Sequence, residues 1–263
     1  EYTQMAGRAG RPEYEKFGES IIIAKSSAER DEIHERYILG EPEDIYSKLA
    51  AEPVLRTYLL SLISSGLIRD TKTMKEFFSK TFWAHQYGDM EKLISIMDRM
   101  ISLLDEWKFI EAGDTSDFVP ANVEKDGRMR STPIGRRVSE LYLDPLTANY
   151  LLSCLEKFDE TKNVFSLLQM ISHTLEMRPL IRTKQKEMDF VHNELGKRYE
   201  YLLEEEPSSF DMEYGEFVNS IKTALFFEEW ISEKGEDFLL ETFGSRPGEI
   251  RAKVENANWL LYS

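Results

Sequence analysis

The pattern with the clearest chemistry lies at the start of the chain, where two arginines follow a glutamine and two glycines. Gln4, Gly7, Arg8, Gly10 and Arg11 are spaced as Gln-x-x-Gly-Arg-x-Gly-Arg. A guanidinium beside the γ-phosphoryl oxygens of ATP stabilises the charge that develops during hydrolysis, which contributes about 10³–10⁵ in rate. Arginines three apart on a turn and helix start can point the same way, and the glycines allow close approach of a facing domain. The pattern predicts a nucleotide-facing site with Arg8 and Arg11 as catalytic residues; a Gly/Arg-rich surface loop is the alternative.

A tryptophan in the last expected helix, residues 246–262, is the second candidate. One apolar stripe of this helix consists of Ile250, Val254, Ala257 and Leu261. At about 100° per residue, Trp259 lies about 180° from Ile250, with Arg251 toward the flank between them. The indole could stack on an unpaired base, which is worth roughly 1–3 kcal/mol. Packing against another helix is the alternative.

The net charge is −15, which argues against non-specific nucleic-acid binding by the surface as a whole, because phosphates repel acidic surfaces. A local exception is the segment 125–137, where five cations stand against one carboxylate. The arginines of this basic segment are Arg128, Arg130, Arg136 and Arg137. They could contact phosphates from a β-ribbon, or they could form a solvated turn or an interface with other domains.

Several classes of site are not indicated by the sequence. Cys154 is the only cysteine, so a disulfide within the chain is impossible and a reducing, cytoplasmic location is expected. The four histidines lack paired ligand spacing, and we expect no metal site. Apolar runs such as 21–24 and 58–60 are far shorter than the roughly 20 residues of a membrane-spanning helix, and we expect no signal peptide at the start of the chain.

The elements that must position these residues change character twice along the chain. Residues 1–30 are typical of the tail of a larger domain, with 21–24 as one buried strand whose partners must lie upstream. Residues 31–143 predict three helices and then a small β-ribbon, which is the order of a winged helix. Residues 144–263 predict long helices with short connections, which is typical of a bundle.

Within the middle part, one helix carries Leu55, Leu59 and Ile63 at helical spacing, and a second is expected to be capped by Thr73 with Glu76 as its capping box. That second helix is expected to extend through Phe82. A third helix is expected over 90–107, followed by extended segments at 109–112, 118–122 and 129–133, with a turn at 126–127. The bundle helices are expected at 145–160, 162–175, 182–204, 214–234 and 246–262.

The run from Gln4 to Pro12 resembles motif VI of superfamily 2 helicases. Further segments make essentially the whole chain similar to the archaeal Holliday-junction-migration (Hjm) DNA helicases. These segments are Gly18-Glu19, Ile21-Ile22-Ile23, Arg36-Tyr37-Ile38, Gly40-Glu41-Pro42, Ser47-Lys48-Leu49, Gly135, Ser139, Tyr142, Asp144-Pro145-Leu146-Thr147, Lys222-Thr223-Ala224-Leu225, Trp230-Ile231, Val254-Glu255 and Trp259.

The resemblance implies an ATP-driven helicase that unwinds stalled or branched DNA in the 3′-to-5′ direction. Its ATP and Mg²⁺ would be held between two RecA-like motor domains, where Gln4, Gly7, Arg8 and Arg11 would face the nucleotide. The chain has no Gly-x-x-x-x-Gly-Lys-[Ser/Thr] loop, so we expect no cofactor and no ATP hydrolysis in this chain by itself. Trp259 would be the base-stacking residue of a ratchet helix.

One position departs from the family pattern that the resemblance implies. The family pairs the stacking tryptophan with an arginine seven residues earlier, and this chain has Ala252 there. The neighbouring Arg251 is the candidate substitute. Its direction on the helix differs from that of position 252 by one residue step, or about 100°.

The sequence is therefore identified as a mainly α-helical C-terminal fragment of such a helicase. Residues 1–30 would be the tail of the second motor domain, 31–143 the winged helix and 144–263 a truncated ratchet bundle. The expected partners are single-stranded and forked DNA and the upstream motor domains, with no membrane. An RNA helicase of the exosome or spliceosome type and a stand-alone winged-helix DNA-binding regulator are the alternatives.

Overall fold

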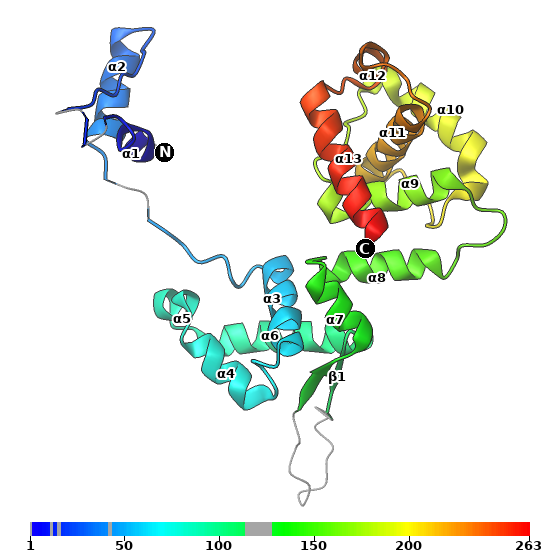
Figure 1. Ribbon diagram of the computed structural model, residues 1–263, viewed down its shortest axis with the longest axis horizontal. Coiled ribbons are helices and arrows are strands. Elements are labelled where there is room, and N and C mark those ends of the chain that lie inside the picture. Colours follow the sequence, from blue (N-terminus) through cyan, green and yellow to red (C-terminus); the bar gives the residue numbers. More distant parts are fainter. Residues whose placement is uncertain (1, 11–12, 15–16, 42–43, 114–127) are drawn as a thin grey trace, which may run out of the picture. The chain divides into compact units, whose positions relative to one another are not determined.

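The computed structural model describes residues 2–10, 13–14, 17–41, 44–113 and 128–263. The chain divides into two compact units, Glu1–Ser47 and Lys48–Ser263, which Figure 1 shows in sequence colours. Among the described residues, no helix combines the length and the apolar character that a membrane span needs. The described residues are mainly α-helical, as predicted. The division into 1–30, 31–143 and 144–263 stays a prediction.

The first unit contains α1 (Tyr2–Ala6), α2 (Ser27–Ile33) and the π-helix η1 (His34–Ile38). The side chain of Ser26 caps α2 by accepting a hydrogen bond from the backbone N–H of Glu29. The buried strand predicted at 21–24 is wrong for this structure. Residues 21–24 are irregular, and the side chains of Ile21 and Ile23 are 81% and 88% exposed. A strand needs a neighbour to pair with, and the described part of this unit contains none.

The second unit opens with helices followed by a two-stranded ribbon, which is the predicted order. β1 pairs with β2 in an antiparallel register that places Glu111 opposite Arg130. α3 packs on α6 and α7, and its buried leucines lie on one face at the expected spacing. These elements are α3 (Glu52–Ser64), α4 (Thr71–Ser79), α5 (Phe82–Tyr87), α6 (Met90–Glu106), β1 (Ile110–Ala112), β2 (Met129–Ser131) and α7 (Pro133–Glu140). The extended segment expected at 118–122 and the turn at 126–127 lie outside the described residues.

The start of α4 corrects a predicted cap. Asp70 is the N-cap, and its carboxylate accepts a hydrogen bond from Thr73 N at 2.7 Å, while Asp70 N donates to Thr73 Oγ1 at 3.1 Å. Thr73 is thus the third residue of the helix, and the predicted pairing with Glu76 is wrong. The hydrogen bonds that the backbone N–H and the hydroxyl of Thr73 donate to the Asp70 carboxylate lower the pKa of Asp70. Phe82 also belongs to a new helix, α5, which is capped by Thr81.

The short helix α7 was not predicted, and one glycine explains its position. Thr132 caps α7: its hydroxyl accepts a hydrogen bond from Gly135 N at 3.0 Å and donates one to Lys108 O at 2.8 Å. A Cβ atom added at Gly135 would lie 1.8 Å from the carbonyl oxygen of Phe109. Only glycine therefore allows α7 to lie directly on the chain that enters β1.

The rest of the second unit is a helical bundle around α11. Residues 217–227 of α11 are buried on nearly every side, because α9, α10 and α12 pack against this helix. The elements are α8 (Pro145–Leu155), α9 (Val164–Ser172), η2 (Leu175–Met177), η3 (Gln185–Glu187), α10 (Met188–Arg198), η4 (Tyr199–Tyr201), α11 (Tyr214–Ile231), α12 (Glu236–Phe243) and α13 (Pro247–Tyr262). The helices expected at 145–160, 162–175 and 182–204 are all shorter than predicted, and α12 was missed.

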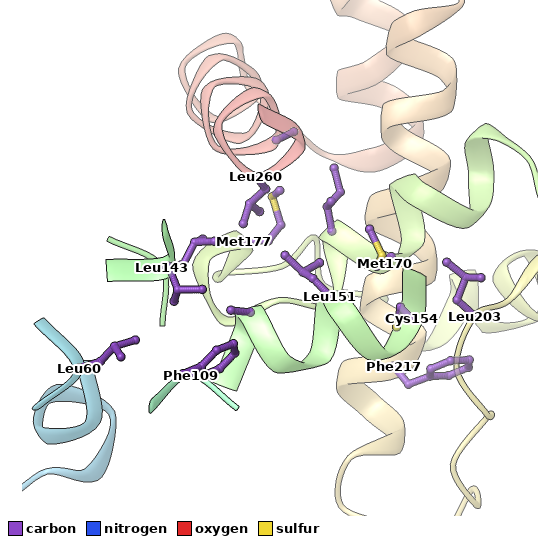
Figure 2. Packing of buried hydrophobic residues seen from close by; sticks show 14 of the residues in the cluster. Leu60, Phe109, Leu143, Leu151, Cys154, Met170, Met177, Leu203, Phe217 and Leu260 are labelled. Atoms are coloured by element: carbon purple, nitrogen blue, oxygen red, sulfur yellow. The ribbon is translucent and has the colours of Figure 1, made fainter. Parts of the chain in front are cut away.

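A continuous apolar core joins the winged-helix elements to the bundle. Leu60 and Phe109 lie at one end of this core, and Leu143, Leu151 and Leu260 continue it past α8 to α13 (Figure 2). Because both sets of elements contribute to this core, burial of its apolar surface stabilises both. Trp83 is 5% exposed and belongs to the core, whereas Trp230 is 40% exposed.

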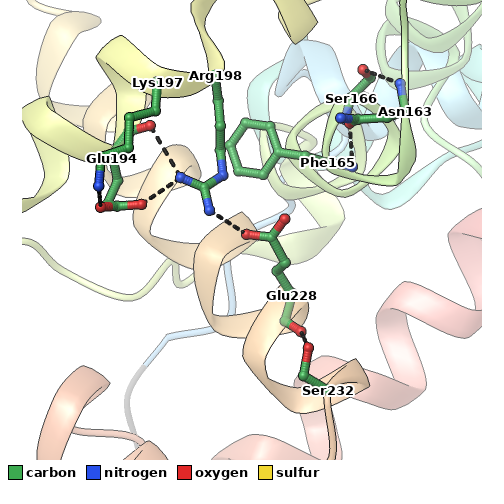
Figure 3. A network of polar contacts seen from close by, with 8 residues as sticks. All are labelled: Asn163, Phe165, Ser166, Glu194, Lys197, Arg198, Glu228 and Ser232. Carbon is green, nitrogen blue, oxygen red and sulfur yellow. Dashed lines mark hydrogen bonds and ion pairs between the residues drawn. The ribbon is translucent and has the colours of Figure 1, made fainter.

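One polar network ties three bundle helices together (Figure 3). The Arg198 guanidinium at the end of α10 pairs with Glu194 on the same helix and with Glu228 of α11, the latter at 2.9 Å. Its Cζ lies 5.4 Å from the centre of the Phe165 ring, which α9 provides. Because the guanidinium stacks and donates in the same position, α9, α10 and α11 are held in one arrangement.

Candidate nucleic-acid interface

The candidate interface is built on α13, whose buried face differs from the predicted stripe. Arg246 N donates to Glu249 Oε2 at 2.9 Å, which closes the first turn before Pro247 continues the helix. Ile250 and Ala257 are buried as predicted. Leu261, however, is 51% exposed, and Leu260 is buried in its place. The prediction that Leu261 belongs to the core is wrong, because the bundle covers the face of α13 that carries Leu260.

Trp259 lies at the edge of this buried face. Its side chain is half-buried and packs against the apolar core. With about 100° per residue, it lies about 100° around the helix from the buried Leu260 and about 160° from the buried Ala257. An indole supported on one side and open on the other has one surface free for stacking. Base stacking by Trp259 stays a prediction.

The predicted substitute, Arg251, is directed elsewhere. Its Nε atom donates to Glu255 Oε1 at 2.9 Å, and the two side chains are 83% and 63% exposed. The hydrogen bond with Glu255 raises the pKa of Arg251. On a helical wheel Arg251 is about 80° from Trp259 and about 100° from Ala252. The structure therefore pairs Arg251 with a carboxylate on the solvent side of α13.

The basic segment is divided between two elements. Arg130 lies on β2, and Arg136 and Arg137 lie on α7, so they do not form one ribbon surface as predicted. Arg136 and Arg137 are both exposed. The Cζ atom of Arg137 lies 5.9 Å from the ring centre of Tyr262, so α7 contacts the last turn of α13. Phosphate binding by Arg136 and Arg137 stays a prediction.

The Gln-x-x-Gly-Arg pattern lies on α1 and the turn after it. Gln4, Gly7 and Arg8 are exposed, and Arg8 N donates to Met5 O at 3.1 Å. Arg11 lies outside the described residues. The geometry leaves Gln4 and Arg8 available to a nucleotide bound elsewhere, and that role stays a prediction.

The interface includes one segment that the sequence did not predict, residues 178–184, which we call the strap. Only residues 182–184 of the strap were predicted to be helical, as the start of the helix 182–204, but α11 holds the whole strap in an irregular form. Ile181 N donates to Thr223 Oγ1 at 3.1 Å, and Thr183 N donates to Asn219 Oδ1 at 2.7 Å. Backbone N–H groups that bind side chains of another helix are not available for a helix of their own.

A buried lysine completes the attachment of the strap. Lys222 of α11 is 2% exposed; its Nζ atom donates to Arg182 O at 3.2 Å and to Glu187 Oε2 at 2.7 Å. Burial opposes ionisation of Glu187, but the hydrogen bonds from Lys222 and from the backbone of Lys184 outweigh it and lower its pKa. The polar pair Lys222-Thr223 inside an otherwise apolar helix was the sequence signal for this contact.

Comparison with known families defines the class of these elements. The family model "Archaeal helicase, domain 4" matches residues 165–263, and a model for a helix-turn-helix domain matches residues 18–111. The predicted fold class, a winged helix with a small ribbon followed by a helical bundle, is confirmed.

Individual relatives identify the family more narrowly than these two domain models. The "ATP-dependent DNA helicase Hel308" proteins of Methanocella arvoryzae, Methanocaldococcus jannaschii and Thermococcus kodakarensis are 35%, 38% and 34% identical to this chain over its whole length. The chain spans 34%, 20% and 22% of the length of these three relatives. The chain is thus a homologue of the C-terminal part of archaeal Hel308 helicases, and the resemblance to an archaeal DNA helicase is confirmed.

Proposed function

We propose that this chain is the strand-holding part of an ATP-dependent DNA helicase. Its main support is the similarity of the whole chain to Hel308 helicases, together with the half-open indole of Trp259 on α13. In this proposal, single-stranded DNA crosses α13, and Trp259 stacks on a base between successive steps of the motor.

The motor itself requires residues beyond those of this chain. We infer that ATP and Mg²⁺ are bound by motor domains, and that Gln4, Gly7, Arg8 and Arg11 face the nucleotide from the side of this chain. The exposed positions of Gln4 and Arg8 support this inference. Translocation would run 3′ to 5′ on forked or branched DNA. Arg11→Ala in the longer protein should abolish ATPase activity without unfolding it; normal turnover would contradict the assignment.

Three features of α13 suit a stacking helix. Ile250 and Ala257 anchor one face of this helix in the core. Its last turn contacts α7 through Tyr262 and Arg137. Trp259 lies between these two anchors, so its ring would lose little conformational freedom on binding a base.

The direct test measures binding of fluorescent oligo-dT to the 263-residue chain by anisotropy. Trp259→Ala should raise Kd by about 5-fold to 150-fold, the equivalent of roughly 1–3 kcal/mol of stacking, and Trp259→Phe should retain part of the affinity. Trp230→Ala is the matched control, because Trp230 is also partly exposed but lies on α11. Unchanged binding by a folded Trp259→Ala chain, verified by circular dichroism, would reject the stacking role.

The alternatives make different predictions in the same assay. An RNA helicase should bind oligo-U more tightly than oligo-dT. A stand-alone winged-helix regulator should bind one duplex sequence tightly through residues 31–143 and should be insensitive to Trp259→Ala.

A further inference from the structure

A groove separates the strap from α13. Its volume is about 420 Å³, and its walls include Arg178, Arg182 and Lys184 of the strap and Ala252 of α13. The groove lies on the flank of α13 that carries Trp259, because Trp259 is seven residues after Ala252 and only about 20° away from it around the helix. Trp259 is therefore about 10 Å beyond Ala252 along the same edge.

The two walls of the groove are held in a fixed position. Lys253 of α13 donates to Pro179 O, and Asn256 Nδ2 donates to Glu176 O at 3.1 Å, just before the strap. Burial lowers the pKa of Lys253, and its ammonium group serves to join the walls. With the bonds from α11 to the strap, the groove is formed before any ligand arrives, so binding needs little ordering of the chain.

The groove gathers positive charge in an acidic chain. Four cationic side chains and one carboxylate, Glu249, line it, whereas the whole chain carries −15. Arg178 pairs with Glu216, and Lys253 is engaged with the strap. Arg182 is exposed, and within the described ranges its side chain has no hydrogen bond or ion pair. Its backbone is nevertheless fixed, because Arg182 O accepts from the buried Lys222.

We propose that this groove binds the phosphodiester backbone of the single strand whose base stacks on Trp259, and that Arg182 is its principal phosphate contact. The proposal rests on the proposed function. A guanidinium forms two parallel hydrogen bonds to phosphate oxygens, and Arg182 has no competing carboxylate. The small side chain of Ala252 leaves the groove open opposite the strap, so that Arg182 can reach a phosphate there.

The experiment measures the salt dependence of oligo-dT binding by the 263-residue chain. Loss of one phosphate contact on single-stranded DNA makes the slope of log K against log salt shallower by about 0.7. Arg182→Gln should make the slope shallower by this amount. Trp259→Ala should weaken binding but keep the slope, because stacking releases no counterions.

Arg182→Gln combined with Ala252→Arg should restore the slope of the unaltered chain, since the new guanidinium enters the same groove.

Lys186→Gln is the charge control, because Lys186 follows the strap in sequence but does not line the groove. It should keep the original slope. The groove assignment would be overturned if Arg182→Gln left the slope unchanged, or if Lys186→Gln made it shallower by the same amount. Trp259→Ala would still test stacking in either case. Failure of the unaltered chain to bind oligo-dT would instead overturn the proposed function and this inference with it.

Discussion

The ion pair between Arg56 and Asp144 links the winged-helix elements to the bundle and is the most informative place to perturb the second unit. Arg56 Nε and Nη2 donate to the two carboxylate oxygens of Asp144 at 2.6 and 2.7 Å, and the side chains are 9% and 14% exposed. Asp144 also caps α8 by accepting from Leu146 N at 2.8 Å. The pair therefore holds α3 against the first turn of α8.

The expected magnitude follows from burial. Removal of one partner of a buried ion pair leaves an uncompensated charge and costs about 3–5 kcal/mol, so Arg56→Met should destabilise the second unit by about this amount. Asp144→Ala should cost more, because it also removes a helix cap worth about 0.5–2 kcal/mol. Arg56→Met combined with Asp144→Ala should cost less than the sum of these two single changes, because the double variant leaves no unpaired charge.

Urea denaturation followed by tryptophan fluorescence measures this effect, because all four tryptophans belong to the unit Lys48–Ser263. Lys80→Met is the control: Lys80 pairs with Glu76 on the surface of α4, where the side chains are 71% and 61% exposed. We expect no measurable change there, since water and salt screen exposed pairs. The reasoning is refuted if Arg56→Met shifts the transition no more than Lys80→Met, or if the two changes at the pair are additive.

Three further predictions concern other parts of the second unit. Gly135→Ala should destabilise it by about 1–3 kcal/mol or more through the backbone clash. Gly196→Ala in the open part of α10 should leave the urea midpoint unchanged or raise it. A urea midpoint for Gly135→Ala equal to or above that for Gly196→Ala would contradict this. Burial raises the pKa of Glu187, but the hydrogen bonds from Lys222 and the backbone of Lys184 outweigh it and lower this pKa. The ionised carboxylate therefore contributes stability above the unfolded pKa, which is lost as pH falls through the folded pKa. Glu187→Gln should therefore be less stable at neutral pH and approach the unaltered chain below about pH 4 in parallel melts; a constant difference would exclude the linkage. Burial raises the pKa of the Cys154 thiol, so a chromogenic disulfide reagent should react far more slowly with it in the folded chain than in urea, and equal rates would show that it is accessible.

Much of the helical architecture could be predicted because it depends on local spacing. The helices α6 and α11 begin and end within a few residues of the predicted ranges, since each carries apolar residues where it packs. The capping error at Thr73 has an equally local cause. Asp70 and Thr73 can both accept hydrogen bonds from a helix N-terminus, and the preceding chain decides which does so.

The strap could not be predicted, because its conformation depends on residues about forty positions away. Its backbone bonds to Thr223 and Asn219 replace the bonds of a helix, and no local pattern in 178–184 indicates that exchange. The same holds for the face of α13. Leu260 and Leu261 are equivalent in hydropathy, and only the elements packed beside α13 decide which leucine is buried.

This dependence on distant residues also explains why charge counted along the sequence did not find the groove. A scan of consecutive residues finds 125–137, but in the structure Arg136 and Arg137 leave the ribbon for α7. The groove cations come instead from the strap and from Lys253, about seventy residues apart in sequence. A net charge of −15 is compatible with such a groove, because at physiological salt the Debye length of about 8 Å limits repulsion from carboxylates elsewhere on the surface. The consequence is measurable: raising the salt concentration should weaken oligo-dT binding through Arg182, whereas the stacking contribution of Trp259 should persist.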